Sequence, residues 1–167
     1  MFKSVVVVFV AGLGTMPMPS AFAQQACEGK LSRLFEHAGG YDTDAILDDP
    51  LVAVELRRLL GSELEHLREN LGVRGGADLK SCDLVIEGNA NHRGTEENGI
   101  VTVNLVSGAV AAGILSAGRI TLYAVGDGYF SMPLAIRDWI AVVAAGFNYR
   151  FEPPASTQLE MAEPATP

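Results

Sequence analysis

The side chains best suited to chemistry in this sequence are gathered in one polar stretch, residues 88–98. His92 and Arg93 lie there side by side, and Glu96 and Glu97 follow closely. An imidazole near carboxylates can act in acid–base catalysis, ligate a metal or make charged contacts with a partner. Each of these roles needs further residues, which the rest of the chain must supply.

A metal site or a hydrolytic site at His92 lacks the residues that would complete it. A protein-bound metal usually takes three or four ligands, and only Glu96 or Glu97 stands at a useful spacing. Covalent hydrolysis needs an activated nucleophile, and the sequence contains no Gly-x-Ser-x-Gly motif. We therefore predict no metal, no cofactor and no enzymatic activity. A hydrolase that pairs His92 with Glu96 or Glu97 is the weakest alternative.

Two apolar segments must hold this polar stretch. The residues at 82–86 and 100–106 are rich in Val, Ile and Leu, which is typical of buried strands. A long polar loop between such strands displays its side chains while the sheet fixes its ends. We interpret residues 88–98 either as a solvated connection without a role or as a binding loop. The partner-binding residues of such a loop would be Asn91, His92, Arg93, Glu96 and Glu97.

The N-terminus has the pattern of a secretory signal peptide over residues 1–23. Lys3 precedes an apolar run at 5–13, and the Ala-Phe-Ala sequence at 21–23 has the small residues of a cleavage site. We expect cleavage after Ala23 and a periplasmic or secreted mature protein. No later stretch is apolar and long enough to span a membrane. The residues before Cys27 also lack the pattern of a lipidated cysteine, so we predict no membrane anchor.

The mature chain is acidic. Without Lys3 it carries 11 basic and 20 acidic residues, a net charge of −9. Binding to nucleic acid requires a basic surface, so we predict no nucleic-acid partner. An acidic exported protein favours a basic protein partner, whose approach it would steer electrostatically.

The sequence contains two cysteines, Cys27 and Cys82. Export to an oxidising compartment predicts one structural disulfide between them, tying the N-terminal segment to the first strand. In the chain-entropy model, closing a loop of about 56 residues stabilises the fold by roughly 4 kcal/mol. The alternative, a catalytic or metal-binding thiol, lacks a CxxC motif or a Cys/His cluster.

Apolar residues recur at helical spacing in four segments, which cover residues 30–38, 50–60, 62–71 and 133–146. Asp49 and Pro50 begin the second segment as N-cap and first helical residue. Ser62 and Glu65 predict a capping box at the start of the third. His37 and His66 lie on these helices among charged neighbours, where a solvated surface histidine is the ordinary case.

Period-two apolar patterns follow, and we expect strands over residues 82–86, 100–106, 109–116 and 119–125. The short turns between them predict an antiparallel meander. The order of elements predicts a single α+β domain over residues 24–152, with helices packed on one face of the antiparallel sheet. Residues 147–151 are predicted to form an edge strand. The Pro-containing segment 153–167 is predicted to be a disordered tail.

Two motifs stand out within this layout: Asn91-His92-Arg93-Gly94, and Ile100-Val101-Thr102-Val103-Asn104 with the strands that follow up to Tyr123. On these residues the chain resembles the family of periplasmic inhibitors of vertebrate (C-type) lysozyme. Members of that family are exported, pack helices on an antiparallel sheet, and place a polar loop with a histidine in the lysozyme cleft. The resemblance implies that His92 meets the catalytic carboxylates of the enzyme, with Asn91 and Arg93 lining the contact.

The sequence departs from that family at the loop, which in the family is typically held by its own disulfide. No cysteine flanks His92, so hydrogen bonds from Asn89, Asn91, Thr95 or Asn98 would have to keep the loop in shape. We predict an exported lysozyme inhibitor with a protein partner, and leave homodimer formation open. The alternative is a non-catalytic envelope protein that binds another envelope protein.

Overall fold

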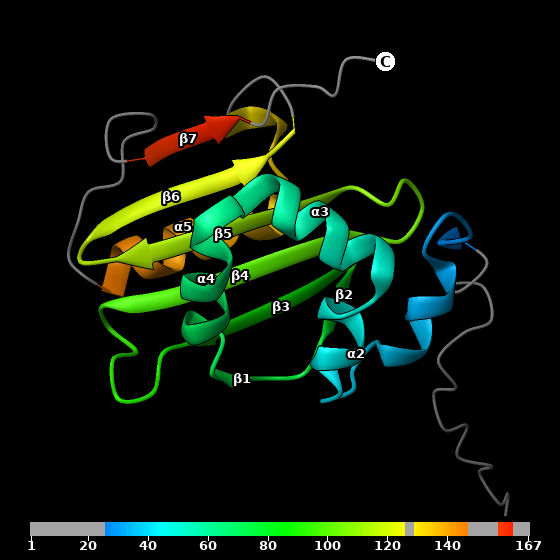
Figure 1. Cartoon of the computed structure of the whole chain (residues 1–167), viewed down its shortest axis with the longest axis horizontal. Coiled ribbons are helices and arrows are strands. Elements are labelled where there is room, and N and C mark those ends of the chain that lie inside the picture. Colours follow the sequence, from blue (N-terminus) through cyan, green and yellow to red (C-terminus); the bar gives the residue numbers. More distant parts are fainter. Residues whose placement is uncertain (1–25, 126–128, 147–156, 162–167) are drawn as a thin grey trace, which may run out of the picture.

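One twisted sheet organises the structure, a computed structural model that describes residues 26–125, 129–146 and 157–161 (Figure 1). Within the described residues the strand order is β1-β3-β4-β5-β6-β7, and β2 also pairs with β3. The strands are β1 (Val73–Arg74), β2 (Asp78–Lys80), β3 (Asp83–Asn89), β4 (Glu97–Asn104), β5 (Val110–Ser116), β6 (Arg119–Ala124) and β7 (Thr157–Met161). The predicted signal peptide, the loop at 126–128 and the predicted edge strand at 147–151 lie outside the described residues.

Strands β3 to β6 form the predicted antiparallel meander, since each pairs with its neighbour along the chain. The β4–β5 and β5–β6 turns are short, and they contain residues with positive φ angles: Gly108 in the first, and Ala117 and Gly118 in the second. Helices precede and follow the meander, so the α+β fold class is confirmed.

The helices before the sheet are η1 (Ser32–His37), α2 (Thr43–Leu47), α3 (Pro50–Leu60), η2 (Gly61–Glu63) and α4 (Leu64–Asn70), and those after β6 are η3 (Tyr129–Ser131) and α5 (Leu134–Gly146). Helix α3 begins as predicted, with Asp49 Oδ1 accepting from Leu51 N at 3.0 Å. The capping box predicted for Ser62 and Glu65 does not form, because η2 runs directly into α4 through helical backbone at Glu63.

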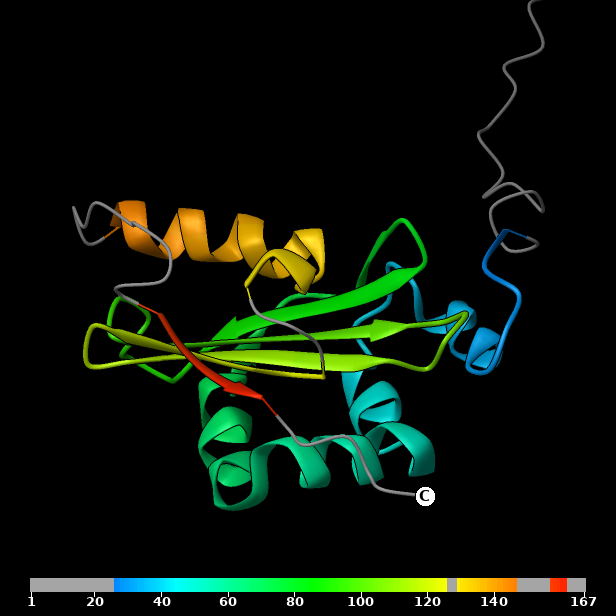
Figure 2. The same ribbon diagram turned by 90° about the horizontal axis from the view of Figure 1, so that it is seen from above.

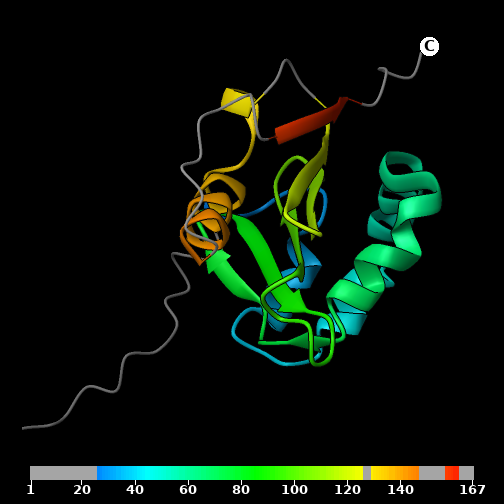
Figure 3. The same ribbon diagram turned by 90° about the vertical axis from the view of Figure 1, so that its left-hand side faces the viewer.

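Helices cover both faces of the sheet, whereas the sequence predicted one covered face. Figures 2 and 3 show α5 on one side and α3 and α4 on the other. Two separate apolar clusters fill these layers. Leu56 and Leu67 join Val101 and Val103 in the first, and Ile100 faces the second with α5. The one-face prediction is therefore correct for α3 and α4 and wrong for α5.

Helix α5 packs closely on β5. A Cβ atom added to Gly113 would lie 2.8 Å from Trp139 Cζ3 and 3.0 Å from Ile100 Cγ2. Glycine is thus required where the indole ring crosses the strand. Trp139, Ile136 and Ile140 are all buried in this layer. Among the described residues, no helix is both long and apolar enough to cross a membrane.

The predicted disulfide is confirmed. The Sγ atoms of Cys27 and Cys82 are 2.11 Å apart, and their Cα atoms are separated by 5.2 Å. Cys82 immediately precedes β3, so the bond ties the N-terminal segment to the start of that strand.

Strand β7 lies in the segment that the sequence predicts to be a disordered tail. It pairs in parallel with β6, with Leu122 opposite Leu159. Parallel neighbours need a crossover connection, and α5 lies between β6 and β7 in the chain. The structure therefore differs from the prediction for residues 157–161, and the rest of that segment lies outside the described residues.

The two-sided packing predicts unequal effects of truncation along α5. Ile140→Ala should lower the free energy of unfolding by about 2–5 kcal/mol, because Ile140 is fully buried against the sheet. Val142→Ala is the matched control on the same helix: Val142 is 70% exposed, and its loss should change stability by less than about 0.5 kcal/mol. Urea denaturation measures both. Equal effects of the two changes would contradict the packing of α5.

Candidate functional site

The polar stretch around His92 is a hairpin loop that is shorter than the sequence indicated. The pairing of β3 with β4 continues as far as Asn89 opposite Asn98. Residues 90–96 remain outside the strands, and we call them the His92 loop. The loop projects from the end of the β3–β4 hairpin, beside α4 (Figure 1).

The backbone of the His92 loop is folded on itself. Arg93 N donates to Ala90 O at 3.1 Å, and Glu96 N and Glu97 N both donate to Arg93 O at 2.9 Å. The turn over residues 90–93 places His92 at a φ angle of +60°. A non-glycine residue rarely adopts this conformation, although histidine does so more often than most. Such conformations gather at functional sites, where the surrounding structure enforces them.

Asparagine side chains support the loop, as expected in the absence of a flanking cysteine. Asn98 Nδ2 donates to Gly94 O at 2.6 Å, and Asn89 Nδ2 donates to Ala90 O at 3.0 Å. A Cβ atom at Gly94 would lie 3.1 Å from Asn89 Nδ2, so the loop closes tightly over that amide. The expected role is confirmed for two of the four proposed residues, Asn89 and Asn98.

The five predicted partner-binding residues divide into two groups. The side chains of Asn91, His92, Arg93 and Glu96 are exposed on the loop. Glu97 is 8% exposed and points away from them, because it is the first residue of β4 and its side chain turns toward α4. The structure therefore leaves four of the five residues exposed in the loop and buries the fifth.

The buried carboxylate of Glu97 lies in a hydrogen-bonded cluster that sequence analysis missed. Oε2 is 2.9 Å from His66 Nε2 and 3.3 Å from Asn70 Nδ2, and Oε1 accepts from Ser116 Oγ at 2.9 Å. The other ring nitrogen of His66 is 3.3 Å from Glu63 Oε2. The expectation that His66 is a solvated surface histidine is wrong, because its two ring nitrogens lie against the carboxylates of Glu97 on β4 and Glu63 on η2.

One local signal could have indicated part of this cluster. Asn70 lies on the apolar face of α4 between Leu67 and Leu71, and it is fully buried. A polar residue within an apolar helical stripe must find hydrogen-bond partners inside the protein. The identity of those partners comes from β4 and β5, which are distant in the sequence.

The cluster shifts the pKa values of both titrating groups. The hydrogen bond to Glu97 raises the pKa of His66 above 6.5; burial opposes this, and Glu63 adds to it. Burial alone would raise the pKa of Glu97, but hydrogen bonds from His66, Ser116 and Asn70 outweigh it and lower the pKa below 4.5. Both shifts favour the ion pair.

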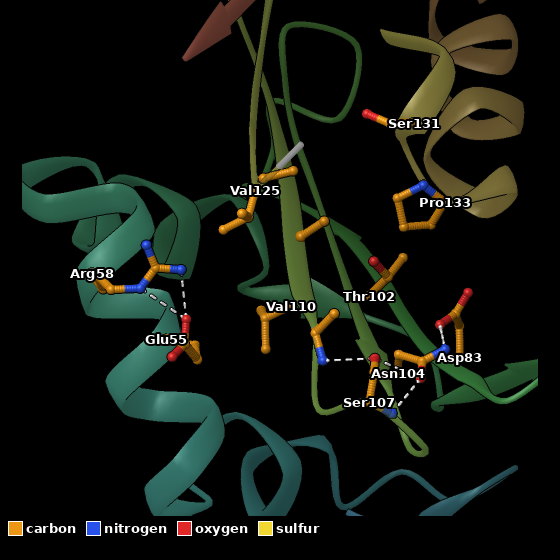
Figure 4. Close-up of a pocket in the computed structure, with 13 residues that line it drawn as sticks. Glu55, Arg58, Asp83, Thr102, Asn104, Ser107, Val110, Val125, Ser131 and Pro133 are labelled. Carbon is orange, nitrogen blue, oxygen red and sulfur yellow. Dashed lines mark hydrogen bonds and ion pairs between the residues drawn. The ribbon is translucent and has the colours of Figure 1, made fainter. Parts of the chain in front are cut away.

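A pocket of about 250 Å³ lies at the opposite end of β4 from the His92 loop (Figure 4). Its charged side chains are engaged with one another or with amides. Arg58 Nη2 donates to Glu55 Oε2 at 2.7 Å, and Asn104 Nδ2 donates to Asp83 Oδ1 at 2.8 Å. Asn104 Oδ1 also accepts from Ser107 N at 2.8 Å. The contacts of Asn104 fix the β4–β5 turn.

The hydrolase alternative required His92 to act with Glu96 or Glu97. Glu97 is instead bonded to His66, and among the described residues no hydrogen bond or ion pair joins His92 to either glutamate. No group of three or more His, Cys, Asp or Glu side chains in the described ranges could hold a metal ion.

Comparison with known families gives one match. The model of the family described as Inhibitor of vertebrate lysozyme (Ivy) matches residues 52–145, which is more than half of the chain. The match contains α4, the His92 loop, the β3–β6 meander and nearly all of α5. No curated protein and no solved structure matches the chain.

The His66–Glu97 pair predicts a stability that depends on pH. The raised pKa of His66 gives stabilisation that is complete below its unfolded value of 6.5 and is lost as pH rises through the folded pKa. The lowered pKa of Glu97 gives stabilisation that is present above 4.5 and is lost as pH falls through the folded pKa. The contribution of the pair should therefore be greatest between these two values.

Urea denaturation of wild type and His66→Gln from about pH 5 to pH 9 measures this contribution. The difference in free energy of unfolding should be greatest near the acid end and shrink toward the alkaline end. His37→Gln is the control, since its neighbouring carboxylate on Glu36 is exposed and 3.7 Å away. A difference between wild type and His66→Gln that stays constant with pH would contradict the assigned pair.

Proposed function

The chain belongs to the inhibitor of vertebrate lysozyme family, and on that premise we propose that it is a periplasmic, non-catalytic inhibitor of C-type lysozyme that inserts the His92 loop into the enzyme's cleft. The observation that carries the proposal is the His92 loop itself. It projects from the β3–β4 hairpin, is held by its own hydrogen bonds, and exposes the side chains of two consecutive residues, His92 and Arg93.

The chemistry of the loop suits a glycosidase cleft. Such clefts contain two carboxyl groups that flank the scissile bond. Arg93 carries fixed N–H donors that match a carboxylate, and the imidazole of His92 offers a further donor. We propose that His92 meets the catalytic carboxylates, with Asn91, Arg93 and Glu96 lining the contact. Glu97 would support this contact surface from beneath, because its carboxylate is buried.

The shape of the loop favours tight binding. A loop that is ordered before association loses less conformational entropy when it binds. The turn that holds His92 at a positive φ angle is closed by backbone hydrogen bonds and by Asn98. The imidazole is thereby presented outward without a disulfide in the loop.

The charge of the molecule also supports an enzyme of this kind as partner. The whole chain has a formal net charge of −8, and a C-type lysozyme is basic. Opposite net charges accelerate the encounter, and a cationic loop tip then meets the acidic cleft. We therefore expect both association and inhibition to weaken as salt concentration rises.

The direct test is titration of mature protein, residues 24–167, against C-type lysozyme, with cell-wall lysis and binding measured at low and physiological salt. Wild type should inhibit stoichiometrically. His92→Asn combined with Arg93→Ala should raise the Kd about 30-fold or more, as expected for loss of a central contact, while Asn still tolerates the positive φ angle. Arg57→Ala is the matched control, since Arg57 is an exposed arginine on α3.

Inhibition by the double variant as strong as that of wild type would exclude the His92 loop as the inserted segment. If Arg57→Ala lost inhibition to the same extent as the double variant, the contact would lie on α3 instead.

We further propose that the protein is exported and that cleavage after Ala23 releases a mature chain beginning at Gln24. The pattern of Lys3, the apolar run and the small residues at 21–23 supports this. The intact mass of protein from the periplasmic fraction should correspond to residues 24–167, and Ala21→Asp with Ala23→Asp should block the cleavage. Uncleaved protein confined to the cytoplasm would contradict export.

A further inference from the structure

The His92 loop is held without a disulfide of its own. Both cysteines of the chain pair with each other, and Cys82 lies just before β3, whereas the loop follows the last residue of that strand. The covalent bond is therefore one strand length away from the loop. The shape of the loop depends on hydrogen bonds.

Glu97 is the residue at which the loop meets the core. Its backbone N–H donates to Arg93 O at 2.9 Å, and its backbone oxygen accepts from Ala90 N at 3.0 Å, so Glu97 closes the loop through the main chain. Its side chain reaches the other way, to His66 on α4 and Ser116 on β5. One residue thus connects the loop backbone to a helix and to a neighbouring strand.

The surroundings of this carboxylate are built closely around it. The fully buried Asn70 side chain brings Nδ2 within 3.3 Å of Glu97 Oε2, 3.1 Å of Asn98 O and 3.2 Å of Leu115 O. An amide carries two hydrogens, so the three acceptors share them. The absence of a side chain at Gly99 favours this approach, since a Cβ atom there would lie 3.3 Å from Asn70 Cβ.

We infer that Glu97 is the positioning residue of the His92 loop: its carboxylate, held by His66, Asn70 and Ser116, keeps the loop in the shape that presents His92 to the partner. What the loop binds rests on the proposed function. The order of the loop does not, and it can be measured in the free protein.

The charged and titratable groups around His66 determine how its hydrogen bond to Glu97 responds to pH. Glu97 faces it from β4 and Glu63 from η2, and Arg119 and Tyr123 of β6 line the same pocket of about 290 Å³. A protonated imidazole donates a stronger hydrogen bond to a carboxylate than a neutral one does. The hydrogen bond between His66 and Glu97 is therefore strong while His66 is protonated and weakens as pH rises.

Amide hydrogen exchange in the full-length mature protein without lysozyme tests this order directly. The amides of Ala90 and Arg93 report on the loop, because both are hydrogen-bonded within it. In Glu97→Ala their exchange, corrected for intrinsic rates, should be about tenfold faster or more than in wild type, because a buried charge-assisted anchor has been removed. Glu96→Ala is the matched control: it deletes the adjacent, exposed carboxylate and should change the same two amides less than about twofold.

The pH profile separates positioning from a general loss of stability. In wild type the protection of Ala90 and Arg93 should fall as pH rises through the titration of His66, whereas in Glu97→Ala it should be low and independent of pH. Ala112, in the core of β5, reports global stability, so its protection should fall in Glu97→Ala only by the loss in free energy of unfolding that urea denaturation gives at the same pH. The Kd for C-type lysozyme should rise about tenfold in Glu97→Ala, since only the ordered fraction of loops can bind. It should remain within about twofold in Arg57→Ala, an exposed position on α3 outside the proposed contact.

Unchanged exchange at Ala90 and Arg93 in folded Glu97→Ala, or equal acceleration in Glu96→Ala, would overturn the inference. If Glu97→Ala fails to fold, Ser116→Ala and His66→Ala each remove one bond to the carboxylate, and unchanged exchange in both would overturn it equally. The expected exchange pattern in a protein that binds no lysozyme would support the positioning role and refute the proposed function.

Discussion

The central constraint on this fold is that strand β4 is covered by helices on both faces. Val101 and Val103 face α3 and α4, while Ile100 faces α5, and none of the three is exposed to solvent. Each face of β4 fits its own apolar cluster, so a one-residue slip in register would move every side chain to the opposite face and disrupt both clusters. The pairing of β3 with β4 is therefore fixed up to Asn89 and Asn98, and the place where the hairpin ends is fixed with it.

Glu97 connects the fixed register of β4 to the shape of the His92 loop. It is the first residue of β4, so its backbone has the fixed register of the sheet, and its carboxylate is buried against α4 and β5. A buried carboxylate is costly unless it is fully hydrogen-bonded, which makes a half-formed version of this junction unfavourable. The exposed side chains of His92 and Arg93 are displayed only a few residues away. The buried side chain that stabilises the loop and the exposed side chains proposed to bind the partner thus belong to adjacent parts of one hairpin.

Local sequence patterns predicted the features that are themselves local. Asp49 and Pro50 began α3 where expected, and the spacing of short turns gave the meander. The second covered face was not recognised, although the continuous apolar runs of β4 and β5 are typical of strands buried on both sides. Contacts such as His66 to Glu97 join residues far apart in the chain and leave no local pattern. For the same reason Glu97 was grouped with the loop surface, and β7, which depends on a crossover through α5, was missed.

The central claim is that the His92 loop, as the hairpin presents it, is the surface that contacts the partner. The most direct measurement is a titration of isotope-labelled mature protein with C-type lysozyme, followed through the backbone amide resonances in NMR. The account predicts that the largest changes occur in residues 90–96, with smaller ones at His66 and Asn70 beneath them. Changes concentrated on α3 or on β6, with the resonances of residues 90–96 unaffected, would contradict it.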